Sequence, residues 1–123
     1  MIIVDTSVWI DHLAKGVSQL ADSLEAEQVL IHPFVIGEIA CGTLKNRTEV
    51  IGYMENLPQP TVATHEEVLT LIEQRRLMGR GIGYIDIHLL ASALLTDTAH
   101  LWTRDRRLRE TAAELDLAHR PHR

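Results

Sequence analysis

The sequence predicts an α/β fold built around a short parallel β-sheet. Three apolar runs indicate its strands, at residues 2–4, 29–31 and 100–102. Short continuous runs of this kind are typical of strands buried on both faces, as in parallel sheets. Helical periodicity lies between the runs, and strands that alternate with helices favour an α/β sandwich. No repeat or low-complexity tract interrupts the 123 residues, so we expect one domain over residues 1–123.

The first half of the chain favours four helices around the first two strands. Gly16 ends the first helix, and Pro33 suits the first turn of the third. The helices expected here cover residues 8–14, 17–26, 33–43 and 45–56. The third contains Cys41, the only cysteine, beside Ile39 and Ala40, so we expect a buried and unreactive thiol. One cysteine excludes an internal disulfide and fits a reducing cytosol.

The second half favours further helices and the last strands. Thr64 and Glu67 have the spacing of a capping box, which starts a helix that runs to about Met78. Residues 79–83 form a glycine-rich loop that lacks the phosphate-binding fingerprint and follows a helix. The other expected elements are a brief strand at 61–63, helices at 84–95 and 106–115, and an edge strand at 117–118.

Charge is distributed unevenly along the chain. The net charge is −5, with 11 acidic and 3 basic residues in 1–73 but 6 acidic and 9 basic residues in 74–123. Arg104, Arg106 and Arg107 flank an acidic residue, and the planar guanidinium suits phosphate. We therefore predict a phosphate-bearing partner there, with a solvated helix face as the alternative.

No apolar run approaches the length of about 20 residues that a membrane span needs. No positively charged start precedes a hydrophobic region, as it would in a signal peptide. We therefore expect a soluble, cytoplasmic protein with no membrane partner.

Four carboxylates occupy positions where they can meet. Asp5 and Asp105 each follow an apolar strand, and the carboxyl ends of parallel strands share the sheet edge where ligands bind. Asp86 lies in the first turn of a helix, where the backbone dipole favours negative charge. Glu38 lies in mid-helix between apolar residues, where an unpaired carboxylate is costly to bury. The ordinary alternatives are a helix cap for Asp5, a helix-end charge for Asp86 and a salt bridge for Glu38.

A divalent cation would relieve the repulsion among carboxylates that share one crevice. Oxygen-only ligands favour Mg²⁺ or Mn²⁺ over zinc. Such a site suits phosphodiester hydrolysis, because metal ions activate water and neutralise the leaving oxygen. The spacing makes the four positions compatible with one site, but it does not demonstrate that they converge.

Four segments, taken in order, carry a family resemblance. They are Ile-Val-Asp-Thr-Ser-Val-Trp at 3–9, Glu38 after the second strand, Ile-Asp-Ile-His-Leu-Leu-Ala-Ser-Ala at 85–93 and Leu-Trp-Thr-Arg-Asp-Arg-Arg-Leu at 101–108. The chain resembles the PIN-domain ribonucleases, specifically the VapC-type toxins of type II toxin–antitoxin systems. The resemblance implies a three-layer α/β/α sandwich around a short, parallel, twisted sheet.

The resemblance also implies a Mg²⁺- or Mn²⁺-dependent endoribonuclease that hydrolyses RNA. Asp5, Asp86 and Asp105 match the family's principal metal ligands, bound directly or through water. Glu38 matches the position that helps to hold a metal through water or orients the attacking water. Together they match the family's catalytic acidic quartet.

Two threonines match polar positions that commonly support such a site through hydrogen bonds, namely Thr6 and Thr103. Leu108 stands where the family often has an aromatic residue, a departure that affects packing rather than chemistry. The resemblance further implies a small VapB-type antitoxin whose C-terminal segment crosses the active-site groove. It also implies a homodimer, which would form a heterotetramer or larger assembly with the antitoxin.

Other interpretations remain open at this point. One is a PIN-like RNA-binding or interaction module without catalysis, and another is a different acidic metal-dependent phosphohydrolase. A haloacid-dehalogenase-like phosphatase needs an aspartate where Ser7 stands, and a receiver domain needs a later lysine, whereas the only lysines are Lys15 and Lys45. A zinc site at His119 and His122 is less favoured than a solvated tail, and we assign no catalytic histidine.

Overall fold

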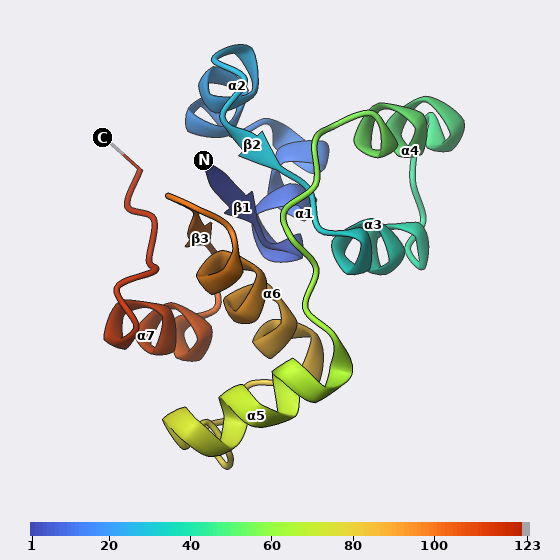
Figure 1. Cartoon of the computed structure of the whole chain (residues 1–123). Helices are drawn as coiled ribbons and strands as arrows, with labels where there is room; N and C mark the ends of the chain where they lie inside the picture. Colours follow the sequence, from blue (N-terminus) through green and yellow to red (C-terminus); the bar gives the residue numbers. More distant parts are fainter. Residues whose placement is uncertain (122–123) are drawn as a thin grey trace.

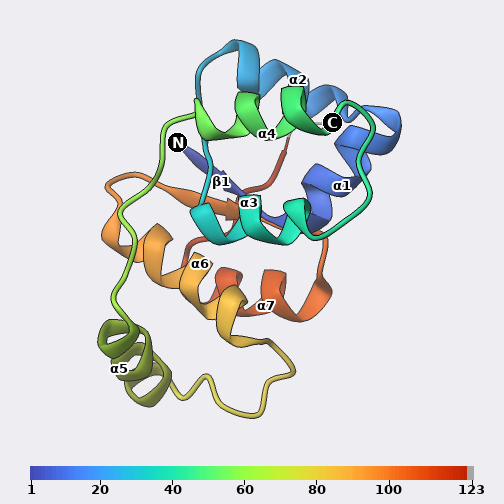
Figure 2. The same cartoon turned by 90° about the vertical axis from the view of Figure 1, so that its right-hand side faces the viewer.

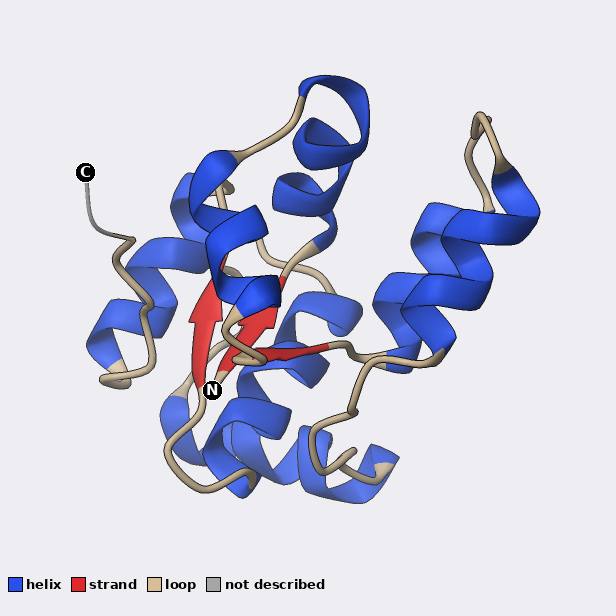
Figure 3. Ribbon diagram, turned by 90° about the horizontal axis from the view of Figure 1, so that it is seen from above, coloured by secondary structure: helices blue, strands red, loops and turns tan. Residues whose placement is uncertain are grey.

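A three-stranded parallel sheet lies in the middle of the molecule (Figures 1 and 3). In the computed structural model, which describes residues 1–121, β1 (Ile2–Val4) lies between β2 (Val29–Leu30) and β3 (His100–Trp102). All three strands run in the same direction, so their carboxyl ends share one edge of the sheet. His122, one of the two histidines of the zinc alternative, lies outside the described residues.

Helices surround this sheet (Figure 3). Within the described residues they are α1 (Thr6–Lys15), α2 (Ser18–Glu25), α3 (Pro33–Ala40), α4 (Arg47–Glu55), α5 (His65–Arg75), α6 (Tyr84–Leu95) and α7 (Arg106–Glu114). Figures 1 and 2 both place α5 at the end of the molecule, away from the sheet and against α6. The predicted α/β fold with a short parallel sheet is therefore confirmed. No helix of residues 1–121 has the length and apolar character needed to cross a membrane.

Burial explains why the first strand and the sixth helix anchor the fold. Every residue of β1 is buried, as its continuous run of β-branched residues predicts. The middle of α6, from Ile87 to Ala93, is buried without interruption. The largest fully buried apolar side chains are Trp9, Ile3, Leu20, Ile31, Met54, Leu77, Leu89, Leu90, Leu101 and Leu108. Their burial supplies the main driving force for folding, because apolar surface leaves water.

Two local predictions in the first half of the chain are wrong. α1 begins at Thr6 rather than at residue 8, because the carboxylate of Asp5 accepts the Thr6 N–H and caps the helix. Cys41 is exposed rather than buried, because α3 ends at Ala40. The apolar neighbours in sequence did not predict burial at the end of this short helix.

The predicted short strands at 61–63 and 117–118 have different outcomes. Residues 61–63 form no strand, although Ala63 is buried. Ala118 makes a single parallel bridge to Leu101, so the predicted edge strand at 117–118 is reduced to one bridge beside β3.

The loop between α5 and α6 is fastened to α7 by two arginines. The guanidinium of Arg80 forms an ion pair of 2.7 Å with Glu114. The side chain of Arg107 packs against Gly81, which has a φ of +76°. A Cβ at this glycine would lie 2.2 Å from Nη1 of Arg107, so a larger residue would displace the arginine. Both the positive φ and the close approach therefore require glycine there.

Candidate active site

Asp5 is the most tightly held of the predicted site residues. It directly follows β1 and is only 6% exposed. Its Oδ1 accepts the Thr6 N–H at 2.8 Å. Its Oδ2 accepts the hydroxyl groups of Ser7 at 2.8 Å and Thr103 at 2.7 Å. The carboxylate is thus oriented by three donors, which satisfies a buried charge.

The same two hydroxyl groups join the end of β3 to the end of β1. Thr103 accepts the N–H of Asp105 at 3.1 Å, while its own hydrogen goes to Asp5. Ser7 accepts the N–H of Arg104 at 3.0 Å. This supporting role of Ser7 was not among the predictions made from the sequence. The signal was a hydroxyl residue two positions after a strand-end carboxylate.

Three of the acids stand at helix N-termini. Asp5 caps α1, and Asp105 caps α7 by accepting the Leu108 N–H at 3.0 Å. Asp86 lies in the first turn of α6, where its Oδ2 accepts the Gly83 N–H at 3.0 Å. The partial positive charges of three helix starts therefore face these carboxylates. The helix-cap alternatives describe real contacts, and such contacts also orient the carboxylates toward a shared site.

Glu38 completes the group from α3. Its Oε1 accepts the hydroxyl hydrogen of Thr6 at 2.7 Å, which ties α3 to the start of α1. Glu38 is exposed, so the predicted cost of burial does not arise. No described residue forms an ion pair with it, and the salt-bridge alternative is therefore not seen in residues 1–121.

The pKa of Asp86 responds to the charges of the other three acids. Burial raises the pKa of the Asp86 carboxyl above its ordinary value. The negative charges of Asp5, Asp105 and Glu38 raise this pKa further, while the hydrogen bond from Gly83 opposes the rise. Asp5, Glu38 and Asp105 therefore each lie within electrostatic reach of Asp86, as their positions after β1, on α3 and after β3 made possible.

The donor set suits a hydrated, hard cation. Within residues 1–121, no three acidic, histidine or cysteine side chains lie close enough together to hold one ion directly. The four side chains nevertheless offer only oxygen ligands, and Asp86 experiences the repulsion that a cation would relieve. Mg²⁺ typically keeps several waters and takes few protein ligands. The residues therefore fit such an ion held partly through water.

The three predicted RNA-contacting arginines have different surroundings. The guanidinium of Arg104 forms an ion pair with Asp11 of α1. The side chain of Arg107 lies against Gly81. Arg106 is exposed and forms no ion pair with another described residue. Of the three, Arg106 thus has the side chain most available to a phosphate.

Two buried histidines, His32 and His88, lie with their ring centroids 5.9 Å apart. His32 caps α3 by accepting the Phe34 N–H at its Nδ1 at 3.0 Å. Its burial, reinforced by His88, lowers the pKa of His32 to about 4. Burial also lowers the pKa of His88, which agrees with its orientation away from Asp86 along α6.

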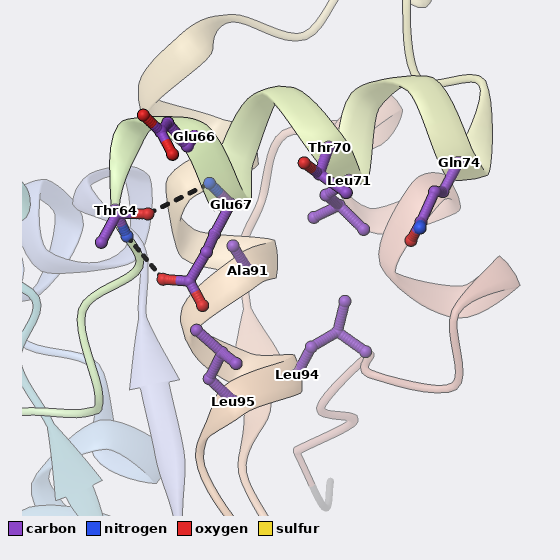
Figure 4. Close-up of a pocket in the computed structure, with 9 residues that line it drawn as sticks. All are labelled: Thr64, Glu66, Glu67, Thr70, Leu71, Gln74, Ala91, Leu94 and Leu95. Atoms are coloured by element: carbon purple, nitrogen blue, oxygen red, sulfur yellow. Dashed lines mark hydrogen bonds between the residues drawn. The ribbon is translucent and has the colours of Figure 1, made fainter.

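Two grooves lie outside this group of acids. One, of about 670 Å³, borders Glu38 between α1, α3 and the loop before α4, and its apolar residues are Ile10, Leu13, Ala14, Ile39, Leu44 and Val50. The other, of about 420 Å³, lies between α5 and the far end of α6 (Figure 4). Figure 4 also shows the predicted capping box, in which Thr64 and Glu67 exchange hydrogen bonds of 2.8 and 3.1 Å.

Comparison with known proteins agrees with this fold. The model of the PIN domain family matches residues 2–114. The chain therefore belongs to the PIN-domain family. It is also similar to Ribonuclease VapC32 from two strains of Mycobacterium tuberculosis, with 48% identity over 118 residues in each case. The match covers 96% of this chain and 95% of each relative. The predicted resemblance to VapC-type PIN ribonucleases is confirmed.

Proposed function

We propose that the chain, as one PIN domain over residues 1–123, is a Mg²⁺- or Mn²⁺-dependent endoribonuclease. It would be the toxin of a cytoplasmic toxin–antitoxin pair. The observation that carries the proposal is that hydrogen bonds through Thr6 and Thr103 join Asp5 to Glu38 and to Asp105, while all three carboxylates lie within electrostatic reach of Asp86. Similarity to Ribonuclease VapC32 over 96% of the chain supports the same function.

Each acid has a distinct part in the proposed reaction. Asp5, Asp86 and Asp105 would hold the cation, directly or through water, and Glu38 would orient the attacking water. The hydroxyl groups of Ser7 and Thr103 keep Asp5 in one orientation, and Thr6 does the same for Glu38. When bound, the cation would supply water activation and neutralise charge at the scissile phosphate.

The test of catalysis uses purified protein and total RNA. We expect cleavage with Mg²⁺ or Mn²⁺, none with EDTA, and a loss of at least about a hundredfold in Asp5→Asn. Asp22→Asn is the matched control, because Asp22 is an exposed aspartate on α2. If the wild type cuts no RNA with any divalent metal, or if Asp5→Asn cuts equally well, the proposed mechanism is wrong. RNA binding without cleavage would favour the non-catalytic PIN-like module.

Arg104, Arg106 and Arg107 are proposed to contact the RNA backbone, with Arg106 the most available. Arg106→Ala should weaken RNA binding and reduce the slope of log affinity against log salt by about 0.7 to 1, as the loss of one phosphate contact does. Arg107→Ala should also disturb the loop at Gly81, so its effect combines binding with positioning. An unchanged salt slope in Arg106→Ala would assign that arginine to the solvated surface.

A VapB-type antitoxin is the proposed inhibitor. The groove beside Glu38 has an apolar wall and opens next to the carboxylates, which would attract a basic side chain electrostatically. Leu13→Glu, on the exposed wall of that groove, should abolish inhibition while leaving cleavage intact. Inhibition unaffected by this change would place the antitoxin elsewhere. A short reading frame beside the gene, encoding a DNA-binding protein, would supply the partner to test.

We also propose a homodimer, which would assemble with the antitoxin as a heterotetramer or larger complex. The groove of Figure 4 supports a surface there, because Leu94 and Leu95, which line it, are each more than 40% exposed. Leu94→Glu should shift the protein to monomer in sedimentation. An unchanged mass would assign the dimer to another face.

A further inference from the structure

Two residues of α1 hold Arg104, and they lie one helical turn apart. The hydroxyl oxygen of Ser7 accepts the backbone N–H of Arg104 at 3.0 Å, and the carboxylate of Asp11 forms an ion pair with its guanidinium. Ser7 and Asp11 are four residues apart, so they lie on the same face of this helix. Both the backbone and the side chain of Arg104 are therefore oriented by α1, although the residue belongs to the segment between β3 and α7.

The backbone of Arg104 belongs to the hydrogen-bond network of the acids. Its neighbours in sequence are Thr103, whose hydroxyl hydrogen is donated to Asp5, and Asp105, whose N–H is donated to Thr103. Ser7 donates its own hydroxyl hydrogen to Asp5 while it accepts the N–H of Arg104. The point from which the Arg104 side chain starts is thus fixed relative to two of the proposed metal ligands.

The guanidinium of Arg104 keeps donors for a further ligand. An arginine has five N–H donors, and the contact with Asp11 is made by Nη1. The side chains of Arg104 and Asp11 are 42% and 35% exposed, so a ligand from solution can reach the pair. Asp11 lies six residues after Asp5, which places it about 9 Å further along the axis of α1. A guanidinium held there suits a phosphate that flanks the scissile one.

The ion pair has two opposite effects on the binding of RNA. A free arginine side chain loses rotamer freedom when it binds a phosphate, whereas one that is already held loses less. Asp11 also carries a negative charge, which repels the RNA backbone. The first effect acts only through Arg104, but the second is independent of that residue. Removal of Asp11 in the presence and in the absence of Arg104 therefore separates them.

We propose that Asp11 is a positioning residue, which holds the guanidinium of Arg104 in place for an RNA phosphate next to the one that is cleaved. The inference rests on the proposed ribonuclease function and on the proposed contact of Arg104 with RNA. It adds the residue through which α1 controls that contact. In this arrangement Asp11 touches neither the cation nor the scissile phosphate. Its removal should therefore raise KM and leave kcat nearly unchanged.

The test is a double-mutant cycle of Asp11 and Arg104. It measures binding of a short fluorescein-labelled RNA of mixed sequence, with Ca²⁺ in place of Mg²⁺ to prevent cleavage. We expect Arg104→Ala to weaken binding by about tenfold. Asp11→Ala should weaken it by about three- to tenfold, although this change removes a negative charge. In the Arg104→Ala background, Asp11→Ala should no longer weaken binding, because no guanidinium is left to position.

Two further variants and a kinetic measurement sharpen the test. Asp11→Glu keeps the carboxylate and should restore most of the affinity that Asp11→Ala loses. Asp22→Ala is the matched control, because Asp22 is another aspartate in mid-helix, on α2, and its removal should not weaken binding. Cleavage of total RNA with Mg²⁺, followed over a range of RNA concentrations, should give Asp11→Ala a raised KM and a kcat within about twofold of the wild type. Thermal melts check that each variant is folded.

The outcomes separate this inference from the function on which it rests. Unchanged or tighter binding by Asp11→Ala, or equal weakening with and without Arg104, overturns the positioning role, while cleavage by the wild type still supports the ribonuclease. A lower kcat without a raised KM also overturns it, because Asp11 would then act on the chemical step. Failure of the wild type to bind and to cleave RNA overturns both. Weakening that requires Arg104 and appears in KM supports the positioning role.

Discussion

The two halves of the acidic site are held in different ways. In the strand half, Asp5 and Asp105 follow β1 and β3 and share the hydroxyl of Thr103, which is 5% exposed. In the helix half, Glu38 and Asp86 are carried by α3 and α6, and Glu38 has one hydrogen bond on an exposed surface. The positions of Asp5 and Asp105 therefore follow from the folded sheet, whereas those of Glu38 and Asp86 depend on how α3 and α6 pack.

The largest expected difference between the halves concerns catalysis. Asp105→Asn should reduce RNA cleavage by about a thousandfold, because it removes a proposed ligand from the rigid half. Glu38→Gln should reduce cleavage by only about tenfold, because its amide can still accept from Thr6. Initial rates on one RNA at saturating Mg²⁺ provide the comparison. Equal losses would show that the two halves are equally important.

Low pH should reduce the stability of the protein through His32, which caps α3 in the helix half. His32 has a folded-state pKa of about 4 against an ordinary value of 6.5, so between these values the unfolded chain takes up a proton that the folded chain does not. The free energy of unfolding should therefore fall by about 3 kcal/mol as pH drops from 6.5 to about 4. His32→Asn, which can still cap α3, should flatten this dependence in urea titrations. His100→Asn, at an exposed histidine, is the control, and an undiminished slope in His32→Asn would contradict this account.

The two supporting threonines should differ in their effects on stability. Thr103→Val leaves the part-buried N–H of Asp105 without its acceptor and removes a donor from the buried Asp5, which should cost about 1–3 kcal/mol. Thr6→Val removes a bond at the exposed Glu38 and should cost about 0.5 kcal/mol. Chemical denaturation of both variants measures the contrast. Similar losses would mean that burial does not distinguish the two halves.

Asp86 should show the smallest effect, with the opposite sign. Because the pKa of Asp86 is raised, its charged form is disfavoured in the folded protein, and stability is lost as pH rises through that pKa. Asp86→Asn should therefore raise the Tm by a few degrees at neutral pH without metal, while still accepting from Gly83. The gain should vanish below about pH 3.8, and Mg²⁺ should stabilise the wild type more than the variant. A lower Tm at neutral pH would contradict the proposed repulsion.

The sequence was most informative about the carboxylates that directly follow a strand. Asp5 and Asp105 could be placed at one edge, because a carboxylate directly after a buried parallel strand has few other positions. The start of α1 was misplaced because Asp5 itself is the cap, and a capping residue and a site residue look alike in sequence. The fold class followed from the alternation of elements and does not depend on such boundaries.

Tertiary contacts limited the remaining predictions. Whether Glu38 is buried depends on what packs over α3, which its apolar neighbours do not reveal. The role of Ser7 depends on Thr103 and Arg104, which are nearly a hundred residues away in sequence. Likewise, nothing local predicts that Arg107 packs on Gly81, because that contact joins a loop to another helix.

The pairing of β1 with β3 has a consequence for synthesis of the protein. Asp5 is synthesised 98 residues before Thr103, whose hydroxyl orients it. The loop that leads to Asp86 is fastened by Glu114, at the end of α7. A nascent chain therefore lacks the complete set of oriented carboxylates until translation has passed these late segments. Chain order alone delays the appearance of the site until Thr103 and Glu114 have both been synthesised.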